Sequence, residues 1–185
     1  MNNNLFHIDV RANTLHIPEI RMQAKKLLEE SLLNATPDIL NRQKELPTFI
    51  TLEYGTYSGL MGEARSCYEF GFFYAAVSLI CIAAEKFAIE LSPKKKGDQS
   101  KRLILLKDTN IIAPKHYEKL GKISRVRDKY MHPKKIEEAD EKKDALEAIS
   151  LFNEVIQERF FDKYEIRDGI IFEKNTNQAI KIIVP

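Results

Sequence analysis

One sequence stretch, FGFFYAAVSLICIAA at residues 70–84, is the longest part of the chain without a charged side chain. No proline interrupts the surrounding sequence from Tyr57 to Leu91, so we predict one long helix there, ended by Ser92-Pro93. A helix that is apolar on nearly every side packs at the centre of a bundle. With 15 residues the run is shorter than the roughly 20 that span a bilayer, which indicates a core helix.

Downstream of this run, apolar residues recur at helical spacing in three segments: 103–106, Tyr117–Met131 and Ala145–Phe160. His132-Pro133 ends the second segment, because proline disfavours the helical conformation in the residue before it. We therefore predict a mainly α fold, a bundle of about five helices.

The two ends of the chain show the two-residue period of β-strands. Alternating apolar and polar residues at 6–10 predict a short strand, and Asp168-Gly169 predicts the turn of a small C-terminal hairpin or sheet within 164–185. Between the first strand and the long helix, the pattern predicts a helix over 18–34 and a second short helix that begins at Thr36-Pro37-Asp38.

The length of 185 residues suits one domain with its own core, and no internal repeat or linker divides it. Within residues 1–185 we distinguish an N-terminal strand and helices (1–50), a helical core (57–163) and a β appendage (164–185).

Composition and cysteine usage exclude several classes of protein. With 30% charged and 44% apolar residues the chain is not intrinsically disordered. Cys67 and Cys81 lie about 21 Å apart along the predicted long helix, so they form no disulfide. The four histidines lack zinc-ligand spacing, and we expect no metal and no cofactor. The first ten residues do not read as a signal peptide, so we expect a cytoplasmic protein without membrane contact.

The segment RVRDKYMHP at residues 125–133 concentrates the side chains that phosphodiester chemistry needs. Histidine is the side chain whose unperturbed pKa lies near neutrality, at about 6.5, so His132 is the candidate to move a proton to or from a ribose hydroxyl or a 5′-oxygen. The guanidinium of Arg127 offers a planar set of donors to phosphate oxygens as charge builds on them. Arg127, His132 and Asp128 are therefore the candidate catalytic residues.

Helical geometry divides these residues between two faces. Asp128 and His132, four positions apart, share a face with Arg125. Arg127 points about 140° away from His132, toward the apolar stripe. One phosphate therefore meets both Arg127 and His132 only if the helix frays before Pro133, or if a second subunit supplies half of the site.

The same residues also fit a structural interpretation. Exposed Arg–Asp pairs on helices contribute at most about 1 kcal/mol, and a histidine near a helix C-terminus is favoured by the helix dipole. The residue chemistry alone leaves both interpretations open.

The pattern Arg127-Asp128-x3-His132 resembles the Arg-(Asn/Asp/His)-x(3 to 5)-His signature of the HEPN superfamily (higher eukaryotes and prokaryotes nucleotide-binding). The segment from Glu63 to Lys86, with small residues, an aromatic pair and Glu85, resembles the long helix of that family. The resemblance covers residues 63–160.

This resemblance implies a metal-independent endoribonuclease at a homodimer interface, acting as a toxin or defence effector. His132 would be the general acid or base, Arg127 would stabilise the transition state, and Asp128 would orient one of them. The implied products are a 2′,3′-cyclic phosphate and a 5′-hydroxyl. The implied partners are RNA, a second copy of the chain and an antitoxin or defence-system protein. Lys134 stands where many toxin members carry a tyrosine, so regulation by adenylylation of such a tyrosine is not expected.

The net charge of +2 conceals a segregation of charge. Residues 94–135 contain 14 Lys and Arg against 4 Asp and Glu, a net charge of +10, and the remainder carries −8. A polyanion would approach this basic segment. We predict RNA contacts from Arg125, Lys129, Lys134 and Lys135.

Two further features complete the predicted site. Glu85 is a polar residue in the wall of an apolar helix, where it supports the motif or is simply solvated. The cluster Phe70, Phe72, Phe73 and Tyr74 is predicted to form core and dimer interface. The alternative to a nuclease is a non-catalytic HEPN-like module that binds a protein partner or a nucleotide in a defence system.

Overall fold

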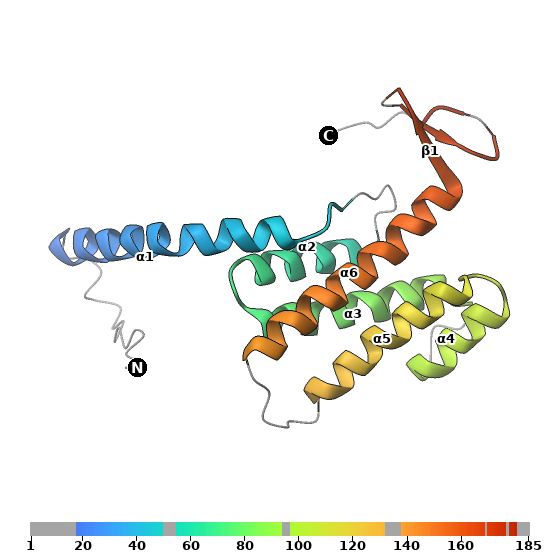
Figure 1. The fold of residues 1–185 in the computed structure, drawn as a ribbon, viewed down its shortest axis with the longest axis horizontal. Helices are drawn as coiled ribbons and strands as arrows, with labels where there is room; N and C mark the ends of the chain where they lie inside the picture. Colours follow the sequence, from blue (N-terminus) through green and yellow to red (C-terminus); the bar gives the residue numbers. More distant parts are fainter. Residues whose placement is uncertain are drawn as a thin grey trace. The chain divides into compact units, whose positions relative to one another are not determined.

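The computed structural model describes residues 18–49, 55–93, 97–131, 138–168, 170–176 and 178–180. This part of the chain forms six helices and one two-stranded antiparallel sheet, so the mainly α fold is confirmed (Figure 1). The elements are α1 (Pro18–Glu45), α2 (Thr56–Glu69), α3 (Phe73–Leu91), α4 (Gln99–Asp108), α5 (Pro114–Met131), α6 (Glu138–Lys163), β1 (Tyr164–Arg167) and β2 (Ile170–Glu173).

The chain divides into two compact units, residues 1–41 and 42–185. The helical core predicted at residues 57–163 lies inside the second unit. The strand predicted at residues 6–10 lies outside the described residues.

α1 continues through Pro37, so the predicted break after Asn34 and the separate second helix are wrong. Proline removes one helical N–H donor and crowds the preceding turn, which weakens a helix without always ending it. The hydroxyl of Thr36 donates to the carbonyl of Leu32 at 2.7 Å, which adds a hydrogen bond within the turn that the proline weakens.

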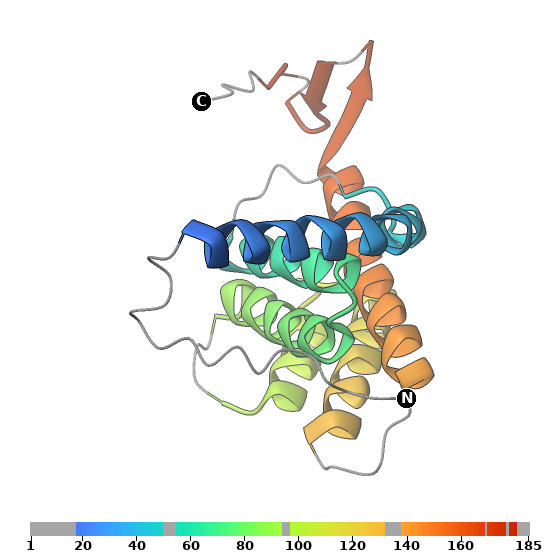
Figure 2. The same ribbon diagram turned by 90° about the vertical axis from the view of Figure 1, so that its left-hand side faces the viewer.

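The single helix predicted over residues 57–91 is two helices, α2 and α3, separated at Phe70-Gly71-Phe72. Gly71 has φ of 84°, a left-handed conformation that glycine adopts without a Cβ clash. Its amide donates to Tyr68 and that of Phe72 donates to Cys67, the paired hydrogen bonds of a Schellman C-cap. The chain turns there, and α2 packs beside α3 (Figure 2).

As a result of this turn, the two cysteines lie on different helices and not on one helix as predicted. Cys67 is on α2 and Cys81 is buried on α3, and both thiols are free.

α3 is the central helix of the second unit, as predicted for the apolar run, and it contacts α2, α4, α5 and α6. Its Phe87 packs edge-to-face against Tyr57 of α2, with centroids 5.2 Å apart, and against Phe152 of α6, at 5.7 Å. Small side chains at Ala83 and Ala84 are fully or almost fully buried, which lets neighbouring helices approach closely. None of the helices in the described ranges is long and apolar enough to cross a membrane.

α6 carries the predicted amphipathic face between Ala145 and Phe160. The buried residues of this face are Ala145, Ala148, Ile149, Phe152, Val155, Ile156 and Phe160. α6 runs beside α5 and leads directly into the hairpin (Figure 1).

The C-terminal hairpin is confirmed. β1 pairs with β2 in a register that sets Arg167 opposite Ile170 and leaves a two-residue loop. Asp168 in that loop has φ of 51°, a conformation that tight hairpin turns require. An isolated bridge between Phe172 and Ala179 continues the antiparallel pairing, and residues 181–185 lie outside the described part of the chain.

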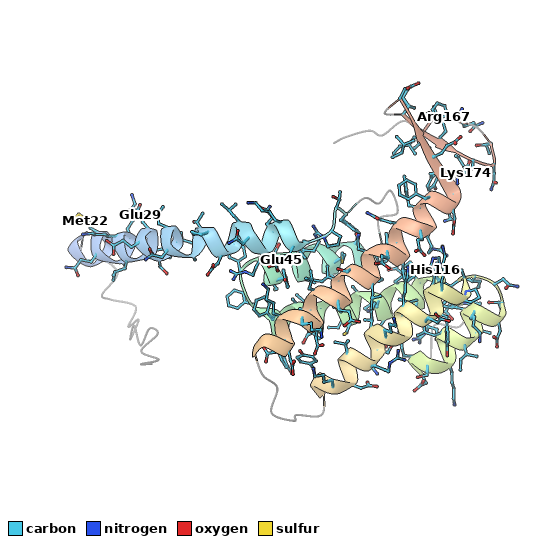
Figure 3. The ribbon with its side chains drawn as sticks, in the orientation of Figure 1. Met22, Glu29, Glu45, His116, Arg167 and Lys174 are labelled. Carbon is cyan, nitrogen blue, oxygen red and sulfur yellow. The ribbon has the colours of Figure 1, made fainter. Side chains whose placement is uncertain are left out.

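A buried polar cluster joins the first turn of α5 to the last third of α6. His116 is buried, and its Nε2 lies 2.9 Å from Oε2 of Glu158 (Figure 3). Lys119 donates to Oε1 of the same carboxylate at 2.6 Å, and Lys115 lies 3.2 Å from Oε2. Burial acts to raise the pKa of Glu158, but the hydrogen bonds from Lys119, Lys115 and His116 and the lysine charge outweigh it and lower this pKa to about 2.

This pKa makes the stability of the protein depend on acidic pH. A carboxylate whose pKa falls on folding stabilises the native state above its unfolded pKa of 4.5, and this contribution disappears as the pH falls toward 2. We expect Glu158→Gln to lower the free energy of unfolding at pH 7, and we expect its difference from the wild type to shrink between pH 4.5 and 2. Urea unfolding followed by circular dichroism at each pH measures this difference.

Glu147→Gln is the control, because Glu147 is an exposed carboxylate on the same helix. This variant is expected to follow the wild type at every pH. A difference between Glu158→Gln and the wild type that stayed constant from pH 7 to pH 2 would contradict the assignment.

Candidate functional site at the end of α5

The motif residues Arg127 and Asp128 form an ion pair in the penultimate turn of α5. Nε and Nη2 of Arg127 donate to one oxygen of Asp128, Oδ1, at 3.2 and 3.0 Å. The two side chains are 38% and 60% exposed, so an external anion can reach them. The carboxylate holds one edge of the guanidinium, and Nη1 takes no part in the pair, so it remains available to phosphate oxygens.

Arg127 lines a small pocket between α3 and α5. The pocket has a volume of about 120 Å³, about four times the volume that one water molecule occupies in the liquid. Its other lining residues are Tyr74, Val77, Ser78, Cys81, Ile82, Glu85 and Tyr130. The structure therefore brings Glu85 and Arg127 into the wall of one pocket.

Arg125 and Asp128 face a different and larger depression, the α4–α5 groove, of about 500 Å³. The residues that line this groove are Ser100, Leu103, Tyr117, Glu118, Gly121, Lys122, Ser124, Arg125 and Asp128. Arg127 lines the pocket and Arg125 lines the groove, as their positions on the helix predict. Asp128 connects the two depressions, because it lines the groove and accepts hydrogen bonds from Arg127.

The last turn of α5 is tied to α6 by Asp144. The hydroxyl of Tyr130 donates to Oδ2 of Asp144 at 3.0 Å, and Lys129 donates to the same oxygen at 2.6 Å. Burial first, and then the bond to Asp144, raise the pKa of Tyr130, so this side chain stays a protonated donor. Lys129 also lies 3.9 Å from Asp140. Its predicted role in RNA binding therefore competes with two carboxylates of its own chain.

The structure describes some of the site residues predicted from the sequence and not others. Arg127, Asp128, Arg125, Lys129 and Glu85 are described. His132, Lys134 and Lys135 lie outside the described residues.

Sequence reasoning missed Tyr74, Tyr130 and Asp144 as parts of the site. Tyr74, Ser78, Ile82 and Glu85 recur at helical intervals, a pattern that could have revealed one wall of the pocket. Tyr130 packs edge-to-face on Tyr74, with centroids 5.6 Å apart, a contact between distant segments that only the fold creates.

The aromatic cluster predicted as core is only partly buried. Phe73 is in the core, whereas Phe70, Phe72 and Tyr74 are each more than half exposed. Three of the four aromatic rings therefore belong to the surface and not to the interior of this chain, and Tyr74 is the one of them that lines the pocket.

No protein-family model, curated protein or solved structure matches this chain. Among the residues that the structure describes, no three His, Cys, Asp or Glu side chains are grouped as metal ligands.

The contacts between α5 and α6 predict that substituting two aspartates beside the same lysine, Lys129, changes the stability of the protein by different amounts. Asp144→Ala leaves the buried hydroxyl of Tyr130 without its acceptor, so we expect the free energy of unfolding to fall by about 1–3 kcal/mol. Asp140→Ala removes only an exposed contact to Lys129 and should change it by less than about 0.5 kcal/mol. Urea titration measures both values, and equal losses would show that Asp144 is no anchor.

Proposed function

We propose that this chain is a HEPN-type endoribonuclease that cuts RNA without a metal ion. The observation that carries the proposal is the exposed Arg127–Asp128 pair, whose guanidinium lines a pocket with Glu85 and belongs to a segment of net charge +10. His132 follows Arg127 by five residues in the sequence, as the resemblance to the HEPN signature requires.

The proposed reaction is an intramolecular transfer at one phosphate of the RNA. A base accepts the proton of the ribose 2′-hydroxyl, and the 2′-oxygen forms a bond to phosphorus. The bond from phosphorus to the 5′-oxygen breaks, and an acid protonates that oxygen. The products are a 2′,3′-cyclic phosphate and a 5′-hydroxyl. In this reaction His132 moves the proton, and Arg127 donates to the phosphate oxygens on which charge accumulates.

Asp128 has a positioning role in this scheme. It holds Nε and Nη2 of Arg127 through a single oxygen, Oδ1, so the guanidinium has one edge fixed before the substrate arrives. A fixed donor set needs less reorganisation when the transition state forms, which is where electrostatic catalysis gains its effect.

We further propose that a second copy of the chain covers the surface formed by Phe70, Phe72, Tyr74 and Ile82. These large apolar side chains are 45–65% exposed, and two of them line the pocket of Arg127. An exposed apolar patch beside a functional group is typical of an interaction surface. A dimer formed there would bring two motifs together, so that Arg127 of one copy and His132 of the other can meet one phosphate.

The catalytic assignment predicts how the wild type, two variants of the site and one control variant act on RNA in excess EDTA. The wild type cleaves. Arg127→Ala lowers the rate by about 10²–10³-fold, since it removes a donor to the transition state. His132→Ala lowers it by about 10²–10⁴-fold, since it removes the proton carrier. Gel analysis of end-labelled RNA measures the rates and identifies the ends.

Arg167→Ala is the matched control, because Arg167 is also an exposed arginine paired with a nearby carboxylate, that of Glu165 at 2.9 Å. It should cleave like the wild type. RNA left intact by the wild type, or cut equally well by Arg127→Ala and His132→Ala, would refute the catalytic proposal.

The dimer predicts unequal effects of two similar substitutions. Ile82 on α3 and Ile104 on α4 are 45% and 43% exposed. Ile82→Asp should convert the dimer to a monomer in light scattering and abolish cleavage, because it buries a charge in the interface. Ile104→Asp should leave both unchanged. A wild type that is monomeric at every concentration would rule out the composite site.

A second candidate function is a non-catalytic HEPN-like module that binds a protein partner, and the exposed apolar side chains around Phe72 favour it. The two candidate functions predict different effects on cell growth. A toxin or defence ribonuclease arrests growth when overexpressed, and His132→Ala relieves the arrest. A binding module produces no such relief.

A further inference from the structure

We propose that the α4–α5 groove binds one nucleotide of the RNA strand, the nucleotide adjacent to the phosphate that Arg127 engages. This inference rests on the proposed function for its occupant, and on the geometry of the groove for its location. The volume of about 500 Å³ lies within the usual range of small-molecule sites, about 300–1,000 Å³.

Three of the four charged side chains that line this groove have no ion-pair partner in the described part of the chain, and the fourth, Asp128, pairs with Arg127. Lys122, Arg125 and Glu118 form no salt bridge with any described residue, whereas Lys115, Lys119 and Lys129 of the same helix all pair with carboxylates of α6. α5 therefore neutralises its cations on the side that packs against α6 and leaves two of them free on the side that lines the groove. Unpaired cations in a concave surface attract anions.

The lining matches the parts of a ribonucleotide. Lys122 and Arg125 supply donors for phosphate oxygens. Glu118 supplies an acceptor for a ribose hydroxyl, the group that distinguishes RNA from DNA. The ring of Tyr117 supplies apolar surface for a base, and Lys107 lies over one face of that ring, 4.9 Å from its centroid.

Asp128 connects this groove to the proposed reaction site. One face of Asp128 lines the groove, and its Oδ1 accepts both hydrogen bonds from Arg127. A strand that passes from the groove across Asp128 reaches Arg127 with its next phosphate. The groove thus selects and holds the neighbouring nucleotide, and Arg127 acts on the phosphodiester beside it.

Gly121 allows the groove to be filled without disturbing the fold. A Cβ placed on Gly121 would have Nη1 of Arg125 as its nearest neighbour, at 3.9 Å, which is an ordinary contact. Gly121→Ala is therefore tolerated and favours the helix, and Gly121→Leu extends a larger side chain from the same wall with similar helix propensity. These two variants form a matched pair that differs in the space left for a ligand.

Binding is measured by fluorescence anisotropy with a labelled RNA oligonucleotide, in the His132→Ala background so that the strand stays intact. We expect Gly121→Leu to bind at least about tenfold more weakly than Gly121→Ala, a loss of about 1.4 kcal/mol. Lys122→Gln should weaken binding and reduce the slope of log K against log salt by about 0.7, the value for one phosphate contact in a single strand. Lys143→Gln, an exposed lysine on α6, is the control with no change.

Equal affinities of Gly121→Leu and Gly121→Ala, or a salt slope of Lys122→Gln equal to that of Lys143→Gln, would overturn the proposal. DNA of the same sequence should bind more weakly than RNA, and equal binding would overturn the assignment of Glu118 to the ribose. Free AMP, GMP, CMP and UMP are titrated by calorimetry. If one of them saturated the groove at a lower concentration than the RNA, the occupant would be a free nucleotide and not an RNA strand.

The experiments distinguish a failure of the groove proposal from a failure of the nuclease proposal. If Arg127→Ala is inactive and Gly121→Leu cleaves like Gly121→Ala, the nuclease stands and the groove is not its subsite. If Gly121→Leu and Lys122→Gln lose RNA affinity while the wild type cleaves nothing, the groove binds RNA and the catalytic proposal fails.

Discussion

The burial of α3 is the constraint on which the second unit of the structure depends. α3 contacts four other helices, α2, α4, α5 and α6, and its position among them removes most of its apolar side chains from water. Phe87 packs on Tyr57 and near Phe152, so that one ring of α3 joins α2 and α6 in a single aromatic cluster. The helices α2, α4, α5 and α6 pack against α3 and cover its apolar side chains.

α5 is held against this core by a different kind of interaction at each end. At its start, His116 and Lys119 contact the partly buried carboxylate of Glu158 and so join α5 to α6. In its last turn, Tyr130 and Lys129 join it to Asp144 of the same helix. Between these anchors Leu120 and Ile123 are buried. A helix fixed at both ends and along its apolar stripe presents its remaining side chains at defined positions, as a functional site requires.

The two exposed sides of α5 then differ in character. One side carries Arg127 and meets the exposed Tyr74 of α3 in a small pocket, and the other carries Lys122 and Arg125 along the α4–α5 groove. The cations of α5 on the α6 side are neutralised within the chain, whereas Lys122 and Arg125 line the groove without a salt bridge to any described residue. The overall charge of +2 is therefore a poor guide to where an anion would bind.

The sequence alone predicted the helical fold, the buried α3, the apolar face of α6 and the hairpin at Asp168, because each depends on local periodicity or a short turn signal. It also predicted that Arg125 and Asp128 lie on a different side of α5 from Arg127, since helical spacing determines this. It misjudged Pro37 and Gly71, because a proline can stay within a helix whereas a glycine with positive φ can end one. Whether a single residue breaks a helix depends on the packing around it.

Only the tertiary structure decided which distant side chains meet. Tyr74 and Tyr130 are 56 positions apart in the sequence, and Tyr130 and Asp144 belong to different helices, so no spacing rule connects them. The exposure of Phe70, Phe72 and Tyr74, beside a buried Phe73, and the choice of which lysines are paired and which are free, also depend on where α3 and α6 lie relative to α5. Local patterns fix the faces of each helix, but the contacts between helices arise from three-dimensional packing.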